Sequence, residues 1–175
     1  FGEVWLPYFN DSVTGIFARN EWSCRWLQAE TINHKLCVDA LRESGAALAI
    51  FAGRGGEIVS AEVLDQGVPM LHMHPGRLPE QRGSTTIYYS ILKGKSCMVS
   101  ALLMDKEIDA GPVVAINAYA IPTADVEVDV IYDCAIRADT MVKVLQYMQQ
   151  RGALPRAKTS DESAGRIYYV VHPLL

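Results

Sequence analysis

Short apolar runs that alternate with helical patterns are the feature that most limits how this chain can fold. The longest run, residues 46–52, is bounded by Gly45 and Gly53 and is typical of a strand buried on both faces of a parallel sheet. Further strands are predicted over residues 12–18, 68–73, 97–104 and 112–116, and helices over 35–43, 61–66, 85–93 and 129–150. This alternation predicts an α/β fold with a mainly parallel sheet, right-handed crossovers and helices on both faces.

Composition supports one globular domain and excludes several classes of protein. Half of the 175 residues are hydrophobic, which excludes intrinsic disorder. The net charge of −4 argues against a protein that gains its affinity from nucleic-acid phosphates. No apolar run approaches the ~20 residues of a membrane span, and no signal peptide is apparent, so we expect a cytoplasmic protein with no membrane partner. The four cysteines show no C-x-x-C spacing and are expected to be free thiols.

The start of the chain does not fit the alternation. Residues 1–9 have a helical pattern, whereas an open parallel sheet normally begins with a strand. One expectation is therefore a leading strand that this sequence does not include.

The richest chemistry lies in MLHMHPGRLPEQRG, residues 70–83. His72 and His74 are two residues apart at the end of an apolar strand, so both side chains should lie on one face of the sheet. Histidine is the side chain best suited to proton transfer near neutral pH. The loop that follows adds two cations, Arg77 and Arg82.

Two further segments follow predicted strands, where α/β sheets bind ligands. In DKEIDAGP, Asp109 lies in a turn from which its carboxylate could orient an imidazole or relay a proton. In FAGRGGEI, three glycines would let a ligand approach the backbone closely. The G-R-G-G spacing matches neither the dinucleotide nor the Walker pattern, so no nucleotide site is predicted.

The segment HMHPGRLPEQRGSTTIYYSILKG, followed by LLMDKEIDAGPVV, resembles the catalytic core of the folate-dependent formyltransferases. That family includes glycinamide ribonucleotide, methionyl-tRNA and sugar-nucleotide N-formyltransferases. The resemblance is clear over residues 46–114 and looser over 12–150. It implies a Rossmann-like fold and N10-formyltetrahydrofolate as the formyl donor, with no metal.

The resemblance also assigns roles to residues. His74 and Asp109 match the family's catalytic histidine and aspartate. Arg77 and Arg82 are candidates either to bind a phosphate of the substrate or to order the loop. Backbone groups that would hold the folate belong to Gly53, Gly55, Gly56, Ile58, Met104, Asp105 and Ile108. We expect residues 1–151 to form the catalytic domain and 152–175 to form a linker and a tail that packs on the domain or on a partner chain. The tail alternates in character, which is typical of an added strand or a contact in a homodimer.

His72 departs from the family, which has asparagine two residues before the catalytic histidine. That asparagine donates a hydrogen bond to the oxyanion formed during attack by the amine. A neutral His72 could replace it only if an N–H points at the oxyanion, and this donor role is our expectation from the sequence.

The function favoured by the resemblance is formyl transfer to a small primary amine, with an amino-sugar nucleotide as the preferred acceptor. Glycinamide ribonucleotide formyltransferase and hydrolysis of formyltetrahydrofolate are alternatives at the same site. Two readings from other classes stay open: a metal-dependent hydrolase that uses the H-x-H pattern, and a catalytically idle relative that binds folate.

Overall fold

The computed structural model describes residues 11–94, 96–158 and 165–172. The strands are β1 (Ala49–Phe51), β2 (Met70–His74), β3 (Gln81–Gly83), β4 (Cys97–Leu103), β5 (Val113–Tyr119) and β6 (Arg166–Tyr168). The helices are α1 (Val13–Arg19), α2 (Lys35–Glu43), α3 (Ala61–Leu64), α4 (Thr86–Leu92), and α5 (Asp133–Arg151), which continues a π-helical turn, η1 (Val128–Tyr132). None of the helices described is long and apolar enough to cross a membrane.

The main sheet is mixed and has the order β1-β2-β4-β5. β1 and β2 are parallel, and β4 runs antiparallel to both β2 and β5, so three of the four strands point in one direction. The predicted α/β class with strands mostly in one direction is confirmed, but β4 is an exception. The link from Leu103 to Val113 is too short for the crossover of a dozen residues that a parallel neighbour needs.

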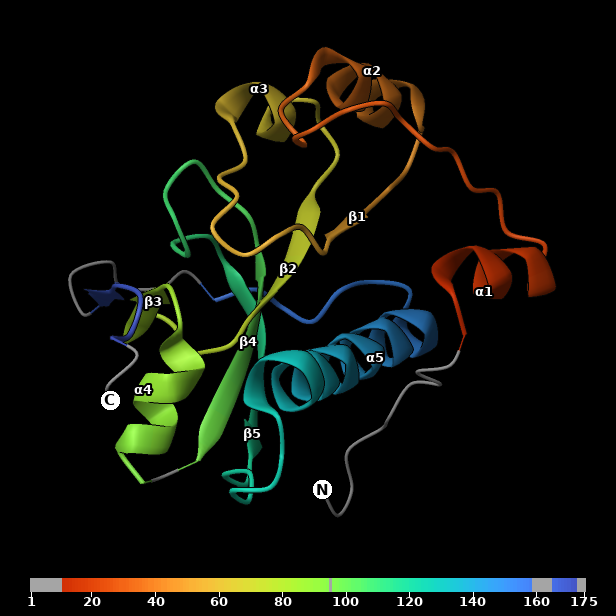
Figure 1. The fold of residues 1–175 in the computed structure, drawn as a ribbon. Helices are drawn as coiled ribbons and strands as arrows, with labels where there is room; N and C mark the ends of the chain where they lie inside the picture. The colour runs from red at the N-terminus through yellow and green to blue at the C-terminus, as the bar shows by residue number, and fades with distance from the viewer. Residues whose placement is uncertain (1–10, 95, 159–164, 173–175) are drawn as a thin grey trace.

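Helices cover both faces of this sheet, as predicted (Figure 1). On one face, α5 packs Ile136 and Val144 against Leu71, Val99 and other core side chains. On the opposite face, Val38 of α2 and Val63 of α3 pack with Met70. Alternation along β2 places His72 and His74 on the same face as Met70. The histidines therefore lie on the face of the sheet away from α5.

Two predicted strands differ from the structure. Residues 12–18 form helix α1 instead of a strand, because the Ser12 hydroxyl accepts a hydrogen bond from the Gly15 amide and caps a helical turn. β1 is shorter than predicted and is not buried on both faces, since it is the last strand of the described sheet and Ile50 is 44% exposed. The predicted helix over residues 1–9 lies outside the described residues.

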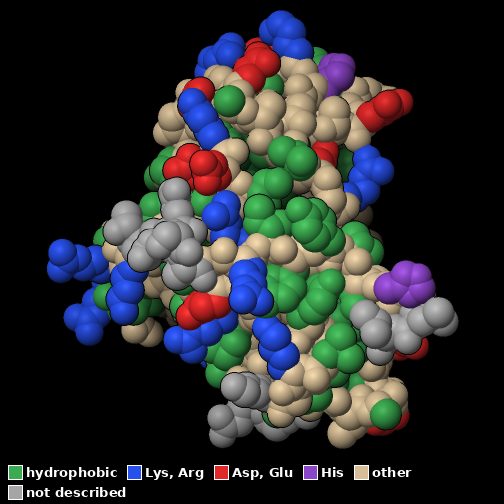
Figure 2. Space-filling model, turned by 90° about the vertical axis from the view of Figure 1, so that its left-hand side faces the viewer, with side chains coloured by type: hydrophobic (Ala, Val, Ile, Leu, Met, Phe, Trp, Pro, Cys, Tyr) green, Lys and Arg blue, Asp and Glu red, His purple; other side chains and the backbone are tan. Residues whose placement is uncertain are grey.

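A second, two-stranded sheet lies beside the main one. β3 pairs in parallel with β6, which puts Arg82 opposite Ile167. The tail then reaches α4, where the Tyr89 hydroxyl donates to the Tyr169 carbonyl. Figure 2 shows this side of the molecule, where hydrophobic side chains are mixed with Lys and Arg. Residues 166–168 are thus an added strand, one of the two roles expected for the tail.

The turn between β4 and β5 has no room for a side chain at Gly111. A Cβ at Gly111 would lie 1.8 Å from the Leu103 carbonyl oxygen, whereas a Cβ at Gly55 would meet nothing within 4 Å. We expect Gly111→Ala to lower the free energy of unfolding by about 2 kcal/mol or more, because the turn must open, and Gly55→Ala to leave it within about 1 kcal/mol. Urea unfolding of both variants measures this. Equal stabilities would show that the turn tolerates a side chain.

Candidate active site

His74 and Asp109 come together although they are far apart in the sequence. His74 ends β2, and Asp109 lies in the loop after β4, which folds back across the same face of the sheet. The His74 Nδ1 and Asp109 Oδ2 atoms are 3.4 Å apart, and His74 is only 2% exposed. The pairing that the sequence predicts is present as a buried imidazole–carboxylate contact.

The backbone of β3 holds both members of this pair. The Gln81 carbonyl oxygen lies 2.6 Å from His74 Nε2, and the Gly83 amide donates to Asp109 Oδ2 at 2.8 Å. A carbonyl can only accept, so Nε2 of His74 carries a proton. Both ring nitrogens of His74 therefore face protein oxygen atoms.

The loop between His74 and β3 is fixed by side chains beneath it. The Ser100 hydroxyl donates to the Gly76 carbonyl at 2.7 Å and accepts from the Leu78 amide at 3.0 Å. The Thr86 hydroxyl donates to the Pro75 carbonyl. A Cβ at Gly76 would lie 2.7 Å from His74 Nε2, so only glycine lets the loop cover the ring this closely.

Asp109 is held in an unusual backbone conformation. Its φ is +53°, in the left-handed region, where aspartate is tolerated better than most residues but still at a cost of about 1 kcal/mol. Arg82 steadies the turn by donating twice to the Ile108 carbonyl, at 2.9 and 2.7 Å. Of the two roles expected for Arg82, substrate binding and ordering of the loop, these contacts correspond to the second, since they brace the loop that carries Asp109.

His72 lies beside His74 with a different set of contacts. Its Nδ1 is 3.3 Å from the Phe51 carbonyl oxygen of the neighbouring strand β1, and its ring lies 5.7 Å from that of Phe51. His72 is half-buried. It therefore lies between His74 and the end of β1, where the glycine-rich loop begins.

The electrostatics of the two histidines are dominated by burial. Burial lowers the pKa of His74 below its usual value, although Asp109 and the Gln81 carbonyl act in the opposite direction. Burial is also the main cause of the lowered pKa of His72, which the Phe51 carbonyl only partly offsets. Arg137 of α5 disfavours the protonated form of both rings.

The two loops expected to hold folate are partly open to solvent, although a Cβ at Gly53 would lie 2.3 Å from the Phe51 ring. In the glycine-rich loop, Cβ positions at Gly55 and Gly56 face open space, and Ile58 is 64% exposed. In the loop between β4 and β5, Ile108 is 52% exposed.

Both loops are anchored to the rest of the domain. Asn33 donates to the Ile58 carbonyl and accepts from the Ser60 amide, and Glu57 accepts from the Ile32 amide at 2.9 Å. Lys106 pairs with Asp65 at the end of α3 at 3.0 Å. The remaining candidate, Arg77, is exposed and pairs with Glu80 at 3.2 Å.

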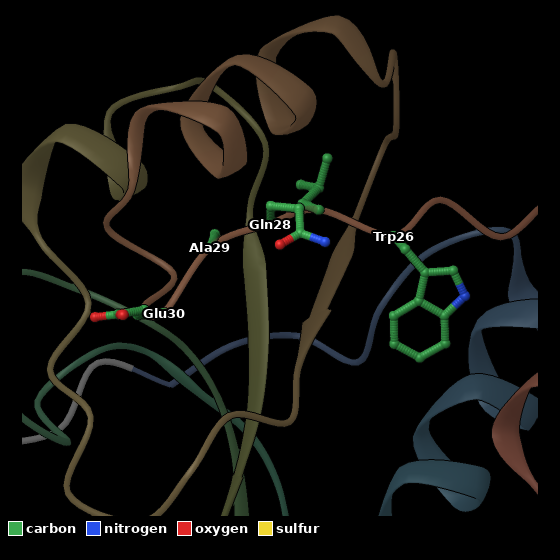
Figure 3. Close-up of a pocket in the computed structure, with 5 residues that line it drawn as sticks. Trp26, Gln28, Ala29 and Glu30 are labelled. Carbon is green, nitrogen blue, oxygen red and sulfur yellow. The ribbon is translucent and has the colours of Figure 1, made fainter.

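Other features of the structure lie away from this site. A hollow of about 580 Å³ is lined by residues 26–30 near β1, and none of the predicted site residues lines it (Figure 3). Among the described residues, no three His, Cys, Asp or Glu side chains group as metal ligands would.

Sequence reasoning missed the residues that position this pair. Ser100 is the one hydroxyl within the apolar strand CMVSALL, a pattern that predicts a buried hydrogen bond but not its partner. Gln81 acts through its carbonyl group, which every residue has, so no pattern of side chains could have identified it. Asn33 carried no signal that we recognised.

Replacing Ser100 should destabilise the loop between His74 and β3. Ser100→Ala leaves the Gly76 carbonyl and the Leu78 amide without their buried partner, so we expect the free energy of unfolding to fall by about 1–3 kcal/mol. Urea unfolding measures the change, with the exposed Ser23→Ala as the control, expected within about 0.5 kcal/mol of the unsubstituted chain. Equal free energies of unfolding for the two variants would show that Ser100 does not stabilise the loop.

The lowered pKa values predict how stability depends on pH. In the unfolded chain a histidine has a pKa of about 6.5, so below that pH the unfolded state binds more protons than the folded state. The free energy of unfolding should therefore decrease as the pH falls from about 7.5 to 5.5, by up to about 1.4 kcal/mol per pH unit for each histidine. His72→Asn removes one of these groups and should reduce the slope in urea unfolding; an unchanged slope would refute the assignment.

Known proteins that resemble this chain in sequence or fold are formyltransferases. No protein-family model matches the chain. Over 71 residues it is 34% identical to a methionyl-tRNA formyltransferase of a Nitratiruptor species, a stretch that is 40% of this chain and 23% of that protein. The chain thus aligns with less than a quarter of the length of that relative.

Solved structures with the same fold cover more of the chain. A methionyl-tRNA formyltransferase from Clostridium thermocellum matches 92% of this chain and 67% of its own, with a TM-score of 0.64 and 15% identity. A sugar N-formyltransferase from a Shewanella species matches 79% of this chain and 55% of its own chain, with a TM-score of 0.60 and 21% identity. HypX from Aquifex aeolicus, in complex with tetrahydrofolic acid, matches 77% of this chain and 24% of its own chain, with a TM-score of 0.50 and 20% identity.

These matches confirm the resemblance indicated by the two motifs. At such identities the solved structures establish the fold, and the methionyl-tRNA formyltransferase adds a shared stretch of sequence. The chain has the fold of the formyltransferases.

Proposed function

We propose that this chain transfers a formyl group from N10-formyltetrahydrofolate to the primary amine of a small molecule. The observation that carries the proposal is the buried contact between His74 and Asp109, 3.4 Å apart and held by one short strand. Formyl transfer needs a proton removed from an amine and a proton delivered to the folate nitrogen. An imidazole paired with a carboxylate suits that exchange.

The folate would bind along the two loops that reach this pair. Gly53, Gly55, Gly56 and Ile58 would line one side, and Met104, Asp105 and Ile108 the other. The open space at Gly55 and Gly56 and the exposed Ile58 and Ile108 support this assignment. The tetrahydrofolic acid in the HypX structure, which shares the fold, is further support.

Bound in this way, N10-formyltetrahydrofolate supplies an activated formyl carbon. Asp109 keeps the His74 ring oriented and favours its protonated form, while the surrounding burial keeps that proton easy to release. A His74 ring held in this way would stabilise the negative charge that develops on the formyl oxygen during attack by the amine. Gln81 and Gly83 prevent both groups from turning away.

We propose an amino-sugar nucleotide as the acceptor. The sugar N-formyltransferase that shares the fold supports this class, and the exposed Arg77 guanidinium could contact a phosphate of the acceptor. Methionyl-tRNA is the second candidate, because the matching stretch of sequence belongs to an enzyme named for it. The acidic net charge of −4 favours the small acceptor.

The proposal is tested by following the change in absorbance as N10-formyltetrahydrofolate is converted to tetrahydrofolate. The protein is incubated with N10-formyltetrahydrofolate and a panel of nucleotide-linked amino sugars, amino acids and methionyl-tRNA. Asp109→Asn keeps an acceptor for the Gly83 amide but loses the charge that orients His74, so we expect turnover to fall by about 10²–10⁴-fold.

Asp125→Asn is the matched control, because Asp125 is exposed on a loop away from the site, and its turnover should equal that of the unsubstituted chain. Formate release without any amine would identify a hydrolase. Tetrahydrofolate binding without turnover by any acceptor, water included, would support the idle relative and contradict the proposed function.

A further inference from the structure

The contact between His72 and Phe51 decides which nitrogen of His72 carries its proton. The Phe51 carbonyl oxygen, 3.3 Å from Nδ1, can only accept a hydrogen bond. Nδ1 is therefore the donor. A neutral imidazole has a single N–H, so Nε2 of a neutral His72 carries a lone pair and accepts.

The Nε2 atom of His72 is available for chemistry, unlike the nitrogens of His74. No group within the described residues hydrogen-bonds to it, and the ring is half-buried. In His74, by contrast, Nε2 faces the Gln81 carbonyl and Nδ1 faces Asp109. Of the two adjacent imidazoles, His72 is the one with an unoccupied ring nitrogen.

The surroundings keep His72 neutral but leave it able to take a proton briefly. Phe51 of β1 and Leu102 of β4, its neighbours in the sheet, carry no charge. Three charged or titratable groups act on it: His74 on β2 and Arg137 on α5 oppose a positive charge, and Asp109 on the β4–β5 loop favours one. Burial lowers the pKa of His72 below its usual value.

We propose that Nε2 of His72 is the base that accepts the proton of the attacking amine. This inference rests on the proposed function and reverses the donor role expected from the sequence. An asparagine at this position would offer an N–H to the oxyanion. A histidine tied to the Phe51 carbonyl offers a lone pair instead.

The step balances without any further reagent. The lone pair of the amine forms the new bond to the formyl carbon, and its nitrogen becomes acidic as that bond forms. His72 Nε2 then accepts one proton, so even a weakly basic imidazole suffices. When the bond from the formyl carbon to the folate nitrogen breaks, that nitrogen keeps the electron pair and takes the proton that His72 Nε2 held, directly or through water, so His72 ends neutral. The products are a formamide and tetrahydrofolate.

Nuclear magnetic resonance tests the proton position without relying on turnover. Protein labelled with ¹⁵N in its histidines is studied near pH 7.5 by long-range ¹H–¹⁵N correlation, and His72→Asn identifies the signals of His72. We expect a protonated Nδ1 and an unprotonated Nε2. A proton on Nε2 would overturn the inference, because that nitrogen would be a donor.

Kinetics of His72→Asn separate a base from a donor. Asparagine keeps an N–H but cannot accept a proton, so we expect formyl transfer at pH 7 to fall by about 10²–10⁴-fold. The rates of both proteins should rise about tenfold per pH unit through the neutral range, because only the deprotonated amine can attack. At lower pH, where His72 gains a proton, the unsubstituted chain should lose a further tenfold per pH unit, and the variant should not. These rates use the fastest acceptor of the panel, or water if none reacts.

The outcomes distinguish this inference from the proposed function. If the unsubstituted chain is active and His72→Asn matches it in rate and pH profile, His72 is not the base, and formyl transfer stands. If the unsubstituted chain neither transfers formyl groups nor releases formate, both claims fail. A slower variant whose pH profile keeps the shape of the unsubstituted chain would indicate a packing role and overturn the inference.

Discussion

The candidate site depends on the backbone of a three-residue strand that lies outside the main sheet. β3 presents the Gln81 carbonyl to His74 and the Gly83 amide to Asp109, so one rigid segment sets the distance between them. β3 is in turn fixed by its pairing with β6 and by the Gln81 side chain, which accepts from the Arg77 amide and donates to Ser90. The tail therefore supports the chemistry without contributing a side chain to it.

Burial and pairing have opposite effects on the pKa values of these two histidines. Taking two imidazoles out of water favours their neutral forms, and the nearby Arg137 adds to this effect. The Asp109 carboxylate pulls in the other direction, most strongly on His74. Burial is the larger effect at both rings, so the pKa of each lies below the usual value for histidine.

Sequence patterns predicted the side chains of the site better than the framework that holds them. The positions of His72, His74 and Asp109 could be foreseen because each follows or ends an apolar strand run. The direction of β4 could not be read from the alternation of strands and helices, which gives the order of elements but not their orientation. The helix at α1 was missed because a short β-branched stretch also suits a strand, and the Ser12 cap decides between them. Gln81 could not be predicted, since it acts through its backbone.

The role that we propose for His72 depends on the geometry around its ring as well as on its residue type. An amide side chain always offers a donor, whereas an imidazole offers a donor or an acceptor depending on what its other nitrogen contacts. Here the Phe51 carbonyl makes that choice, and it belongs to the strand that leads into the glycine-rich loop. The same strand therefore sets the proton position of His72 and the start of the proposed folate site. A shift of β1 would change both together.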